Sequence, residues 1–311
     1  MNGRDYGRVL LLTGGWSGER EISLRSGAAV ERALRAAGVA PTVIDVDRDL
    51  PARLAAGRWD RALVMVHGRG GEDGLLQAML EWFGLPYTGS GVLASALAMD
   101  KWRSKQVWQA AGLPVPPARL LPDETAAAAA AAELGLPLAV KPLCEGSSLG
   151  VSKVERPEDL PPAWRAARRY GAVMAERWIT GVEYTVAVLA GRALPVVRLE
   201  PARPFYDYEA KYGDSGTRYH CPCGLPAEQE ARLQEVALAA FAALGARGWG
   251  RVDLMLDGEG RPWLIELNTV PGMTERSLVP MAARAAGMDL PELVLRILET
   301  ATLEDPSHGQ G

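Results

Sequence analysis

The sequence has few of the side chains that hold transition metals or cross-link a chain. Its 311 residues include three cysteines and three histidines, and the histidines are widely separated at His67, His220 and His308. So few cysteines in a chain of this length form no disulfide framework, so we expect free thiols and a reducing cytoplasm. Cys221 and Cys223 have one proline between them, not the two-residue gap of a zinc or redox pair. We therefore assign no zinc centre and no disulfide scaffold.

The chain also lacks a long apolar run and an excess of positive charge. No run of about 18 apolar residues occurs, so no helix is expected to span a membrane. The apolar run at residues 9–12 is too short for the core of a signal peptide. The 34 lysines and arginines against 38 acidic residues give a formal charge of −4 at pH 7, which argues against a protein that coats nucleic acid. We expect a cytoplasmic, multidomain globular protein.

The first of three expected domains, residues 1–99, alternates short apolar runs with alanine-rich amphipathic stretches. The elements predicted here are strands at 9–12, Thr42–Val46 and 62–66, and a helix at 23–37. Strand, helix and strand in this order indicate a parallel sheet covered by helices. Ligands of such sheets bind beyond the carboxyl ends of the strands, where glycine-rich loops occur at 14–19 and 67–74.

The proline-rich segment at 113–117 marks a change in composition, and the second expected domain is residues 100–183. A helix at Glu124–Leu134 is predicted there, followed by a hairpin whose glycine-rich flap is residues 145–150. The third expected domain is residues 184–311. Its predicted elements are a helix at 228–244, a hairpin at 251–268, and helices at 279–286 and 290–301. The fold class is α/β, or α+β overall.

The flap has the composition of a phosphate-binding loop. Its glycines and the hydroxyls of Ser147 and Ser148 can bring N–H and O–H donors onto phosphate oxygens, and Lys141 adds a positive charge just before it. No Gly-Lys-Ser/Thr follows the glycines, so this is not a Walker A loop. Glycine–serine loops are also ordinary turns, and from this feature alone both interpretations stay open.

The hairpin at 251–268 gathers acidic side chains. If its loop has two or four residues centred on 258–259, Asp253 and Glu266 are diagonal neighbours about 7 Å apart at the backbone, on one face with Arg251 and Asn268. The opposite, buried face would then consist of Val252, Leu254, Leu256, Trp263, Ile265 and Leu267. Oxygen ligands of this kind suit Mg²⁺ bridged to nucleotide phosphates. An odd-length loop would break this register, and a solvated face with an Arg251–Glu266 ion pair is the alternative.

Motifs of fixed order and spacing run along the whole chain. The early ones are Gly14-Gly15-x-Ser17-x-Glu19-Arg20-Glu21, His67-Gly68-x-x-Gly71-Glu72-Asp73-Gly74 and Met99-Asp100-Lys101. The central ones are Lys141-Pro142-x-x-Glu145-Gly146-Ser147-Ser148-x-Gly150 and Phe205-Tyr206-Asp207-Tyr208-Glu209-Ala210-Lys211-Tyr212. The last are Arg251-x-Asp253, Glu266-x-Asn268-x-x-Pro271-Gly272 and Met273-Thr274. With these motifs the chain resembles the D-alanine–D-alanine ligases of the ATP-grasp superfamily over nearly its full length.

The resemblance implies an ATP-grasp architecture in which a central and a C-terminal domain enclose ATP. It implies ATP-dependent joining of two D-alanines through a D-alanyl phosphate, which supplies a peptidoglycan precursor. Both chemical steps concentrate negative charge, so catalysis should depend on cations and aligned N–H donors. The cofactors implied are ATP and two Mg²⁺ or Mn²⁺ ions, and a cytoplasmic homodimer is implied as the assembly.

The resemblance also implies roles at the nucleotide. Lys101 and Lys141 would hold phosphates under a flap that includes Glu145, Ser147 and Ser148. Glu176 would meet the adenine amino group, beside the backbone of Arg177 and Ile179, and Glu183 would bind ribose. The implied metal ligands are Asp253, Glu266 and Asn268.

The remaining implied roles concern the amino acid substrates. Glu19 would bind the first ammonium, with His67 nearby, and Ser147 and Tyr212 would link Glu19 to a closing loop. Arg251 and the Gly272 N–H would form the oxyanion hole. Lys211, also close to the nucleotide, would bind the second carboxylate together with Ser277 and the Leu278 N–H; a helix N-terminus favours an anion there.

Alternatives remain at the level of residues and of function. Glu19 could cap the following helix, Tyr212 could be ordinary packing, and His67 could be a loop histidine. A D-alanine–D-lactate ligase is the nearest functional alternative, but relatives with that activity lack the Lys211-Tyr212 arrangement. A catalytically silent nucleotide-binding protein would be expected to lose metal or oxyanion residues, which are all present here. Cys144 stands where a basic residue often precedes the flap glutamate, which removes one possible positive charge.

Overall fold

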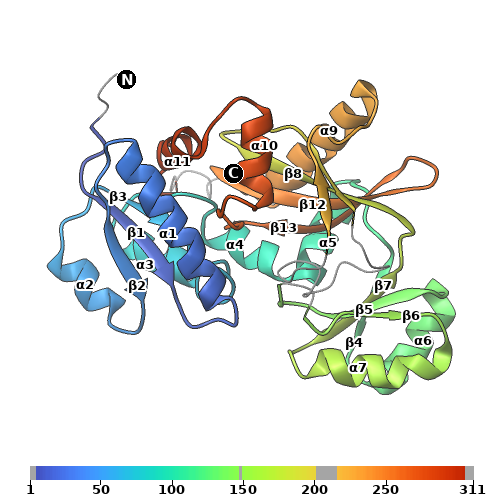
Figure 1. Ribbon diagram of the computed structural model, residues 1–311. Helices are drawn as coiled ribbons and strands as arrows, with labels where there is room; N and C mark the ends of the chain where they lie inside the picture. Colours follow the sequence, from blue (N-terminus) through green and yellow to red (C-terminus); the bar gives the residue numbers. More distant parts are fainter. Residues whose placement is uncertain (1–4, 147–148, 201–215, 305–311) are drawn as a thin grey trace.

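The structure is a computed structural model and describes residues 5–146, 149–200 and 216–304. Within these ranges three sheets follow one another along the chain, each with its own covering helices (Figure 1). The mixture of one parallel and two antiparallel sheets confirms the predicted α/β class. All three cysteines are free, as expected. No helix in the described ranges combines the length and the apolar character that crossing a membrane requires.

The first sheet is parallel, as predicted, in the order β2-β1-β3. Its elements are β1 (Val9–Gly14), α1 (Arg20–Ala36), β2 (Thr42–Val46), α2 (Leu50–Ala56), β3 (Arg61–Val64), α3 (Leu75–Trp82) and α4 (Val92–Met99). Every residue of β1 is buried, which explains its continuous apolar run. The loops at 14–19 and 67–74 leave the carboxyl ends of β1 and β3 and lead towards the next sheets.

Helix α1 begins at Arg20, three residues before the predicted start at Ser23. The predicted helix begins at Ser23, whereas in the structure Ser23 lies inside the helix and its hydroxyl bonds to residues at the strand ends. Ser23 Oγ accepts from Gly14 N at 2.7 Å and donates to Met65 O at 2.6 Å. A polar residue inside the helix therefore ties α1 to the ends of two strands, and Glu19 occupies the N-cap position just before this helix.

The second sheet is antiparallel, in the order β4-β7-β5-β6. Its elements are β4 (Ala118–Leu121), α6 (Glu124–Leu134), β5 (Leu138–Pro142), β6 (Ser152–Val154), η1 (Pro157–Asp159), α7 (Leu160–Arg168) and β7 (Val173–Arg177). Helix α6 has the predicted bounds because the Asp123 side chain accepts from Ala126 N at 2.8 Å and Gly135, with φ of +76°, ends it. Strands β5 and β6 pair as the hairpin predicted on either side of the flap.

The third sheet has the order β11-β10-β8-β12-β13, with β9 beside β8. Its strands are β8 (Gly181–Leu189), β9 (Arg192–Ala193), β10 (Val197–Glu200), β11 (Arg218–His220), β12 (Trp249–Asp257) and β13 (Pro262–Asn268). The helices that accompany it are α5 (Lys101–Ala110), α9 (Ala227–Ala243) and α10 (Leu278–Ala285), and the chain continues into α11 (Leu290–Leu298), which packs on α1 and α10. Buried Trp108 of α5 donates to Ala240 O of α9 at 2.9 Å, which fixes α5 against this layer.

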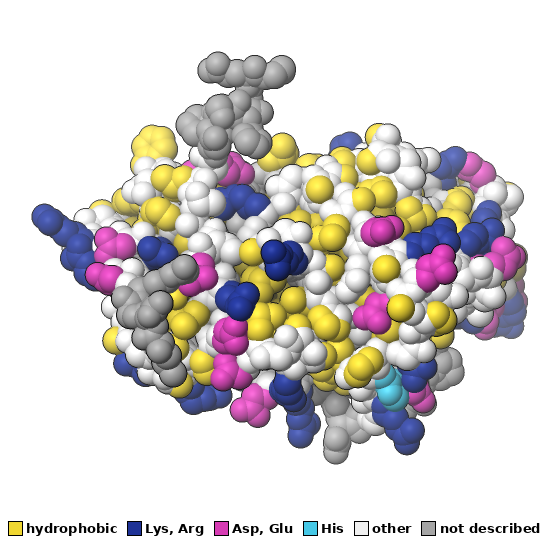
Figure 2. All heavy atoms as spheres, turned by 90° about the horizontal axis from the view of Figure 1, so that it is seen from above, with side chains coloured by type: hydrophobic (Ala, Val, Ile, Leu, Met, Phe, Trp, Pro, Cys, Tyr) yellow, Lys and Arg dark blue, Asp and Glu magenta, His cyan; other side chains and the backbone are white. Residues whose placement is uncertain are grey.

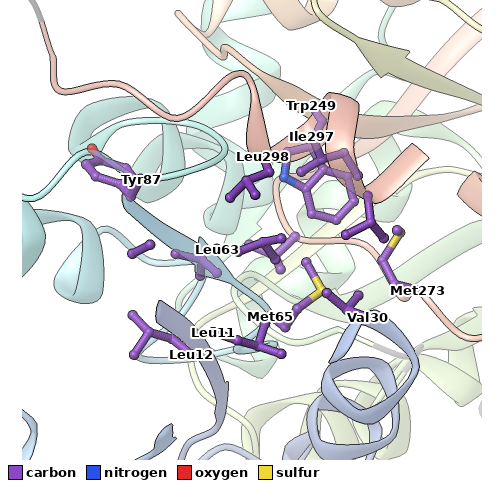
Figure 3. Packing of buried hydrophobic residues seen from close by; sticks show 14 of the residues in the cluster. Leu11, Leu12, Val30, Leu63, Met65, Tyr87, Trp249, Met273, Ile297 and Leu298 are labelled. Atoms are coloured by element: carbon purple, nitrogen blue, oxygen red, sulfur yellow. The ribbon is translucent and has the colours of Figure 1, made fainter. Parts of the chain in front are cut away.

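The first sheet shares its core with the end of the chain. Figure 3 shows Leu11 on β1 and Met65, just after β3, packed near Trp249, Met273 and Ile297. Helix α11 lies against α1 (Figure 1). This packing holds the loops after β1 and β3 beside the loop that follows β13, so distant motifs meet at one place.

Charged side chains of both signs lie on the face of the molecule that Figure 2 shows. On the face in Figure 2, lysine and arginine side chains are interspersed with aspartate and glutamate and with apolar side chains. Among the described residues, side chains of one charge sign do not gather into a single patch on this face.

Candidate active site

A cavity of about 750 Å³ lies between the second and third sheets. Its walls come from α5, β5 and β7 on one side and from β8, β10, β12 and β13 on the other. The predicted nucleotide and metal residues that line it are Lys101, Lys141, Glu145, Glu176, Arg177, Ile179, Glu183, Asp253 and Glu266. Apolar surface is contributed by Val182, Met255 and Ile265. The fold thus brings together charged residues from distant parts of the sequence around a space with an apolar wall, which is the usual composition of a ligand site.

Glu176 on β7 lies between two lysines. Lys141 Nζ is 2.5 Å from Glu176 Oε1, and Lys105 Nζ is 2.8 Å from Glu176 Oε2. All three side chains are almost fully buried. Burial raises the pKa of Glu176, but attraction to the two ammonium groups outweighs it, so the pKa lies below the ordinary value. Burial lowers the pKa of Lys105 to about 8, so below that pH two cations and one anion give the region around Glu176 a net positive charge, which suits an anionic ligand.

Lys101, the first residue of α5, reaches the acidic hairpin and the flap. Its Nζ is 3.0 Å from Glu266 Oε2 and donates to Glu145 O at 2.8 Å. Burial lowers the pKa of Lys101, but the Glu266 carboxylate more than compensates, and the pKa is raised. The ammonium is therefore held charged where the flap, the hairpin and the cavity meet.

The predicted register of the acidic hairpin is wrong in its details. Asp257 N donates to Arg261 O at 3.0 Å, so the loop contains an odd number of residues. A β-bulge between Asp253 and Leu254 of the ladder then inserts Ile265, and Asp253 lies directly opposite Glu266 instead of diagonally. Without the bulge the odd loop would place these two carboxylates on opposite faces; with it they share one face of the sheet.

The bulge also changes which residues are buried. Val252, Leu254 and Leu267 face the core as predicted, whereas Trp263 and Leu256 are only half-buried. Leu264, which was not predicted as a core residue, is fully buried, and Ile265 lines the cavity instead of the core. The acidic face is therefore built by a local irregularity that the alternating pattern does not reveal.

Asp253 is the centre of a buried hydrogen-bond network. Arg251 donates to both of its oxygens, from Nε at 2.8 Å and from Nη2 at 2.7 Å. Thr185 Oγ1 donates to Asp253 Oδ1 at 2.6 Å, and Asn268 Nδ2 donates to Oδ2 at 3.0 Å. The proposed Arg251–Glu266 ion pair of the alternative interpretation is replaced here by a paired Arg251–Asp253 contact, which fixes the guanidinium plane.

A second, small cavity adjoins the first. It shares Lys101, Glu145 and Glu266 with the larger one and is completed by Glu19, Gly68, Glu72, Ala98, Met99, Gly146, Leu267, Asn268 and Thr269. Glu19 lies in contact range of both loops: a Cβ added at Gly68 would be 2.9 Å from Glu19 Oε2, and one at Gly146 would be 2.9 Å from Oε1. An acidic group is therefore placed at the junction of the first sheet and the flap, where a small ammonium ligand would fit.

His67 is a buried residue that immediately precedes Gly68, one of the residues lining the small cavity. Its Nδ1 is 2.7 Å from Val270 O and its Nε2 is 3.0 Å from Ser26 Oγ, and the ring is 4% exposed. Burial lowers the pKa of His67, while Glu19 raises it by a smaller amount. The neutral ring thus joins the loop after β3 to the segment after β13.

The other predicted substrate residues lie at the start of α10. Ser277 occupies the N-cap position, and its Oγ accepts from Thr274 N at 3.0 Å. Leu278 is the first residue of the helix, and a Cβ added at Gly272 would lie 3.0 Å from Ser277 Oγ. Gly272, Ser277 and Leu278 therefore form one cluster, although they line neither of the two cavities. Ser147, Ser148, Lys211 and Tyr212 lie outside the described residues.

Comparison with known proteins agrees with this geometry. Residues 107–299 match the family model "D-ala D-ala ligase C-terminus". A D-alanine–D-alanine ligase of Ectopseudomonas mendocina is 56% identical over 299 residues, which cover 96% of each chain. The chain belongs to the D-alanine–D-alanine ligase family. The crystal structure of the Bacillus anthracis ligase superposes with a TM-score of 0.84 at 34% identity, over 94% of this chain and 96% of that one. The same ligase complexed with ATP superposes with a TM-score of 0.81 at 32% identity, with the same coverage.

Two charged residues beside the site of this ligase have no role predicted from the sequence: Lys105, which is buried, and Glu72, which is half-buried. Lys105 follows Lys101 by one helical turn, and this spacing was the available signal. Glu72 belongs to a recognised motif but was given no role. It accepts from Gly68 N at 2.7 Å and from Val270 N at 3.0 Å, so it connects the loops on either side of the small cavity.

Glu72 should make the stability of this ligase depend on pH. Burial, followed by repulsion from Glu19, raises its pKa from 4.5 to about 8. The folded chain therefore keeps a proton that the unfolded chain releases, and this contribution to stability, present below about pH 4.5, is lost as the pH rises towards 8. Between pH 5 and pH 8 we expect the Tm of the Glu72→Gln variant to fall by less than the Tm of the wild type. The difference between the two falls should be about 3 °C or more.

The matched control is Glu292→Gln, because Glu292 pairs with Arg296 on the exposed side of α11. Differential scanning calorimetry at a series of pH values measures both variants. Equal pH dependence of Tm in the wild type and the Glu72→Gln variant would show that Glu72 does not hold the proton.

Proposed function

We propose that this chain joins two D-alanines with ATP, and that the residues gathered at the two adjoining cavities carry out the reaction. The observation that supports this most directly is the contact of Lys101 with both Glu266 and the flap backbone at the boundary of the cavities. A cation at that point lies where a terminal phosphate in the larger cavity would meet a carboxylate in the smaller one. The similarity of the chain to D-alanine–D-alanine ligases, one of them solved with ATP, supports the choice of substrates.

In the first step the carboxylate of one D-alanine attacks the γ-phosphorus of ATP, the bond to the bridging oxygen breaks, and ADP leaves. Glu19 binds the ammonium of that D-alanine and so aims its carboxylate at the larger cavity. Lys101 and Lys141 neutralise the charge that develops on the transferred phosphoryl group. Glu176 and the backbone of Arg177 and Ile179 orient the base, as they line the wall opposite the hairpin.

In the second step the amine of the other D-alanine attacks the acyl carbon, loses a proton, and phosphate leaves. The Arg251 guanidinium, whose orientation is fixed by its two hydrogen bonds to Asp253, stabilises the oxyanion together with the Gly272 N–H. The N-terminus of α10, with Ser277 and Leu278, attracts the carboxylate of this D-alanine. In this proposal Lys211 binds the same carboxylate, and Tyr212 links Glu19 to a closing loop.

Asp253, Glu266 and Asn268 fit one or two Mg²⁺ or Mn²⁺ ions. Asp253 and Glu266 lie directly opposite each other on one face of the hairpin, and Asn268 contacts Asp253. Among the described residues no three acidic, histidine or cysteine side chains form a complete metal site. Two carboxylates and one amide supply fewer oxygen ligands than a hard cation takes, so phosphate oxygens and water would be its other ligands. Such an ion would neutralise the charge of the transferred phosphoryl group.

The test is phosphate release by the purified chain. We expect release to require D-alanine and Mg²⁺, to stop with a chelator, and to give D-alanyl-D-alanine as the product seen by mass spectrometry, while L-alanine is inert. Competition with D-lactate across pH distinguishes the dipeptide from the depsipeptide. Release that ignores D-alanine but responds to L-amino acids would overturn the substrate assignment.

A silent nucleotide-binding protein is disfavoured because Arg251, Asp253 and Asn268 are present and connected to one another.

The cytoplasmic homodimer implied by the family remains part of the proposal. Sedimentation equilibrium of the purified chain measures the dimer directly, and a monomer at micromolar concentration would contradict it.

A further inference from the structure

Lys105 is a buried lysine that contacts both of the sheets between which the larger cavity lies. It lies on α5 and is 3% exposed. Its Nζ is 2.8 Å from Glu176 Oε2 on β7 and donates to Leu264 O on β13 at 3.3 Å. One ammonium group thus connects the second sheet to the third at the position where the nucleotide base is proposed to lie.

The contact with Lys105 decides whether the Glu176 side chain only accepts hydrogen bonds or can also donate one. Lys141, the other partner of Glu176, is proposed to bind phosphate, so nucleotide binding would draw it away. A buried carboxylate without a cation takes up a proton. An ionised carboxylate only accepts hydrogen bonds, whereas a protonated carboxyl group also donates one. A cation that stays on Glu176 therefore keeps it an acceptor, which favours a donor on the ligand.

We propose that Lys105 is a positioning residue that keeps Glu176 ionised and in place once Lys141 turns to the phosphates. In this way Lys105 makes the site select a purine with an amino group at position 6 over a purine with a carbonyl there. The proposal rests on the proposed function, in which Glu176 meets the adenine amino group. Lys105 itself does not touch the nucleotide; it acts through Glu176 and through the Leu264 carbonyl.

The experiment measures binding of ATP and of inosine triphosphate to the full chain by calorimetry, with Mg²⁺ and without D-alanine. The Lys105→Met variant is expected to bind ATP about tenfold or more weakly and to lose a similar factor of its preference for ATP over inosine triphosphate. The control is Arg103→Met, which removes a charge from the exposed side of the same helix and should change neither quantity. Equal losses for the two nucleotides would overturn the proposal, because they would show a structural role only.

Two further variants keep the test decisive if Lys105→Met folds poorly. In Glu176→Gln the amide both accepts and donates, so the preference should already be lost, and adding Lys105→Met should not reduce it further. Lys105→Arg keeps the charge and should retain the preference. A further loss in the double variant, or loss of the preference in Lys105→Arg, would contradict the proposal. Wild-type chain that binds ATP but shows no D-alanine-dependent turnover would overturn the proposed function, while these binding measurements would still decide the role of Lys105.

Discussion

Replacing Arg251 with methionine is expected to lower kcat by about 10²–10³-fold, with a much smaller effect on the KM for ATP. Arg251 is the only arginine that contacts Asp253 in the described part of the chain, and it uses two N–H groups at 2.8 and 2.7 Å to do so. This paired contact fixes the plane of the guanidinium before the reaction begins, so the proposed contact with the oxyanion needs little reorganisation. Because the charge of the oxyanion exists only in the second step, the loss should fall on kcat.

Steady-state kinetics of D-alanine-dependent phosphate release separates these constants. Arg251→Lys keeps the charge but cannot donate in the same paired geometry, so we expect an intermediate loss. The matched control is Arg261→Met, because Arg261 lies at the exposed turn of the same hairpin and pairs with Asp257. An Arg251→Met enzyme with kcat within a factor of about three of the wild type would rule out the oxyanion role. Loss of folding would be recognised by its Tm and by a similar loss for both substrates.

The parts of the fold that depend on local signals could be predicted from the sequence. Helix α6 has the predicted bounds because Asp123 and Gly135 act on the residues next to them. The parallel first sheet follows from short apolar runs, and the flap hairpin from glycine between two strands. Helix α1 was placed too late because the hydroxyl of Ser23 serves the strands of the sheet, and only the packed structure shows that.

The site depends more on contacts between distant residues, and there the sequence was less informative. The bulge at Ile265 makes Asp253 face Glu266, yet no residue type at this position requires a bulge. Lys105 on α5 meets Glu176 on β7, and the hydrogen bond from Trp108 to Ala240 O fixes the same helix against α9, so this contact depends on packing between distant elements. Glu72 gains its raised pKa from burial between two loops that lie far apart in the sequence. Motif spacing predicts candidate residues, whereas the contacts of Asp253, Lys105 and Glu72 depend on packing.

Replacing Glu266 with glutamine is expected to reduce D-alanine-dependent turnover by roughly 10³-fold and to raise the Mg²⁺ concentration needed for half-maximal rate. The change keeps the size of the side chain but removes a charge that faces Asp253 across the hairpin and Lys101 at 3.0 Å. A neutral amide is a weaker ligand for a hard cation than a carboxylate. Lys101 also loses the carboxylate that holds it at the boundary of the two cavities. Both effects act on phosphoryl transfer, so the loss should appear in the first step.

The Glu259→Gln variant is the control, because Glu259 is exposed at the turn of the same hairpin and pairs only with Arg261 among the described contacts. Turnover is measured over a range of Mg²⁺ concentrations for both variants and the wild type. A metal role predicts that excess Mg²⁺ recovers part of the Glu266→Gln activity, since mass action offsets a weakened site. If the rate falls but its Mg²⁺ dependence does not move, Glu266 acts through Lys101 alone. The hairpin would then hold the lysine that binds phosphate and would not hold the ion.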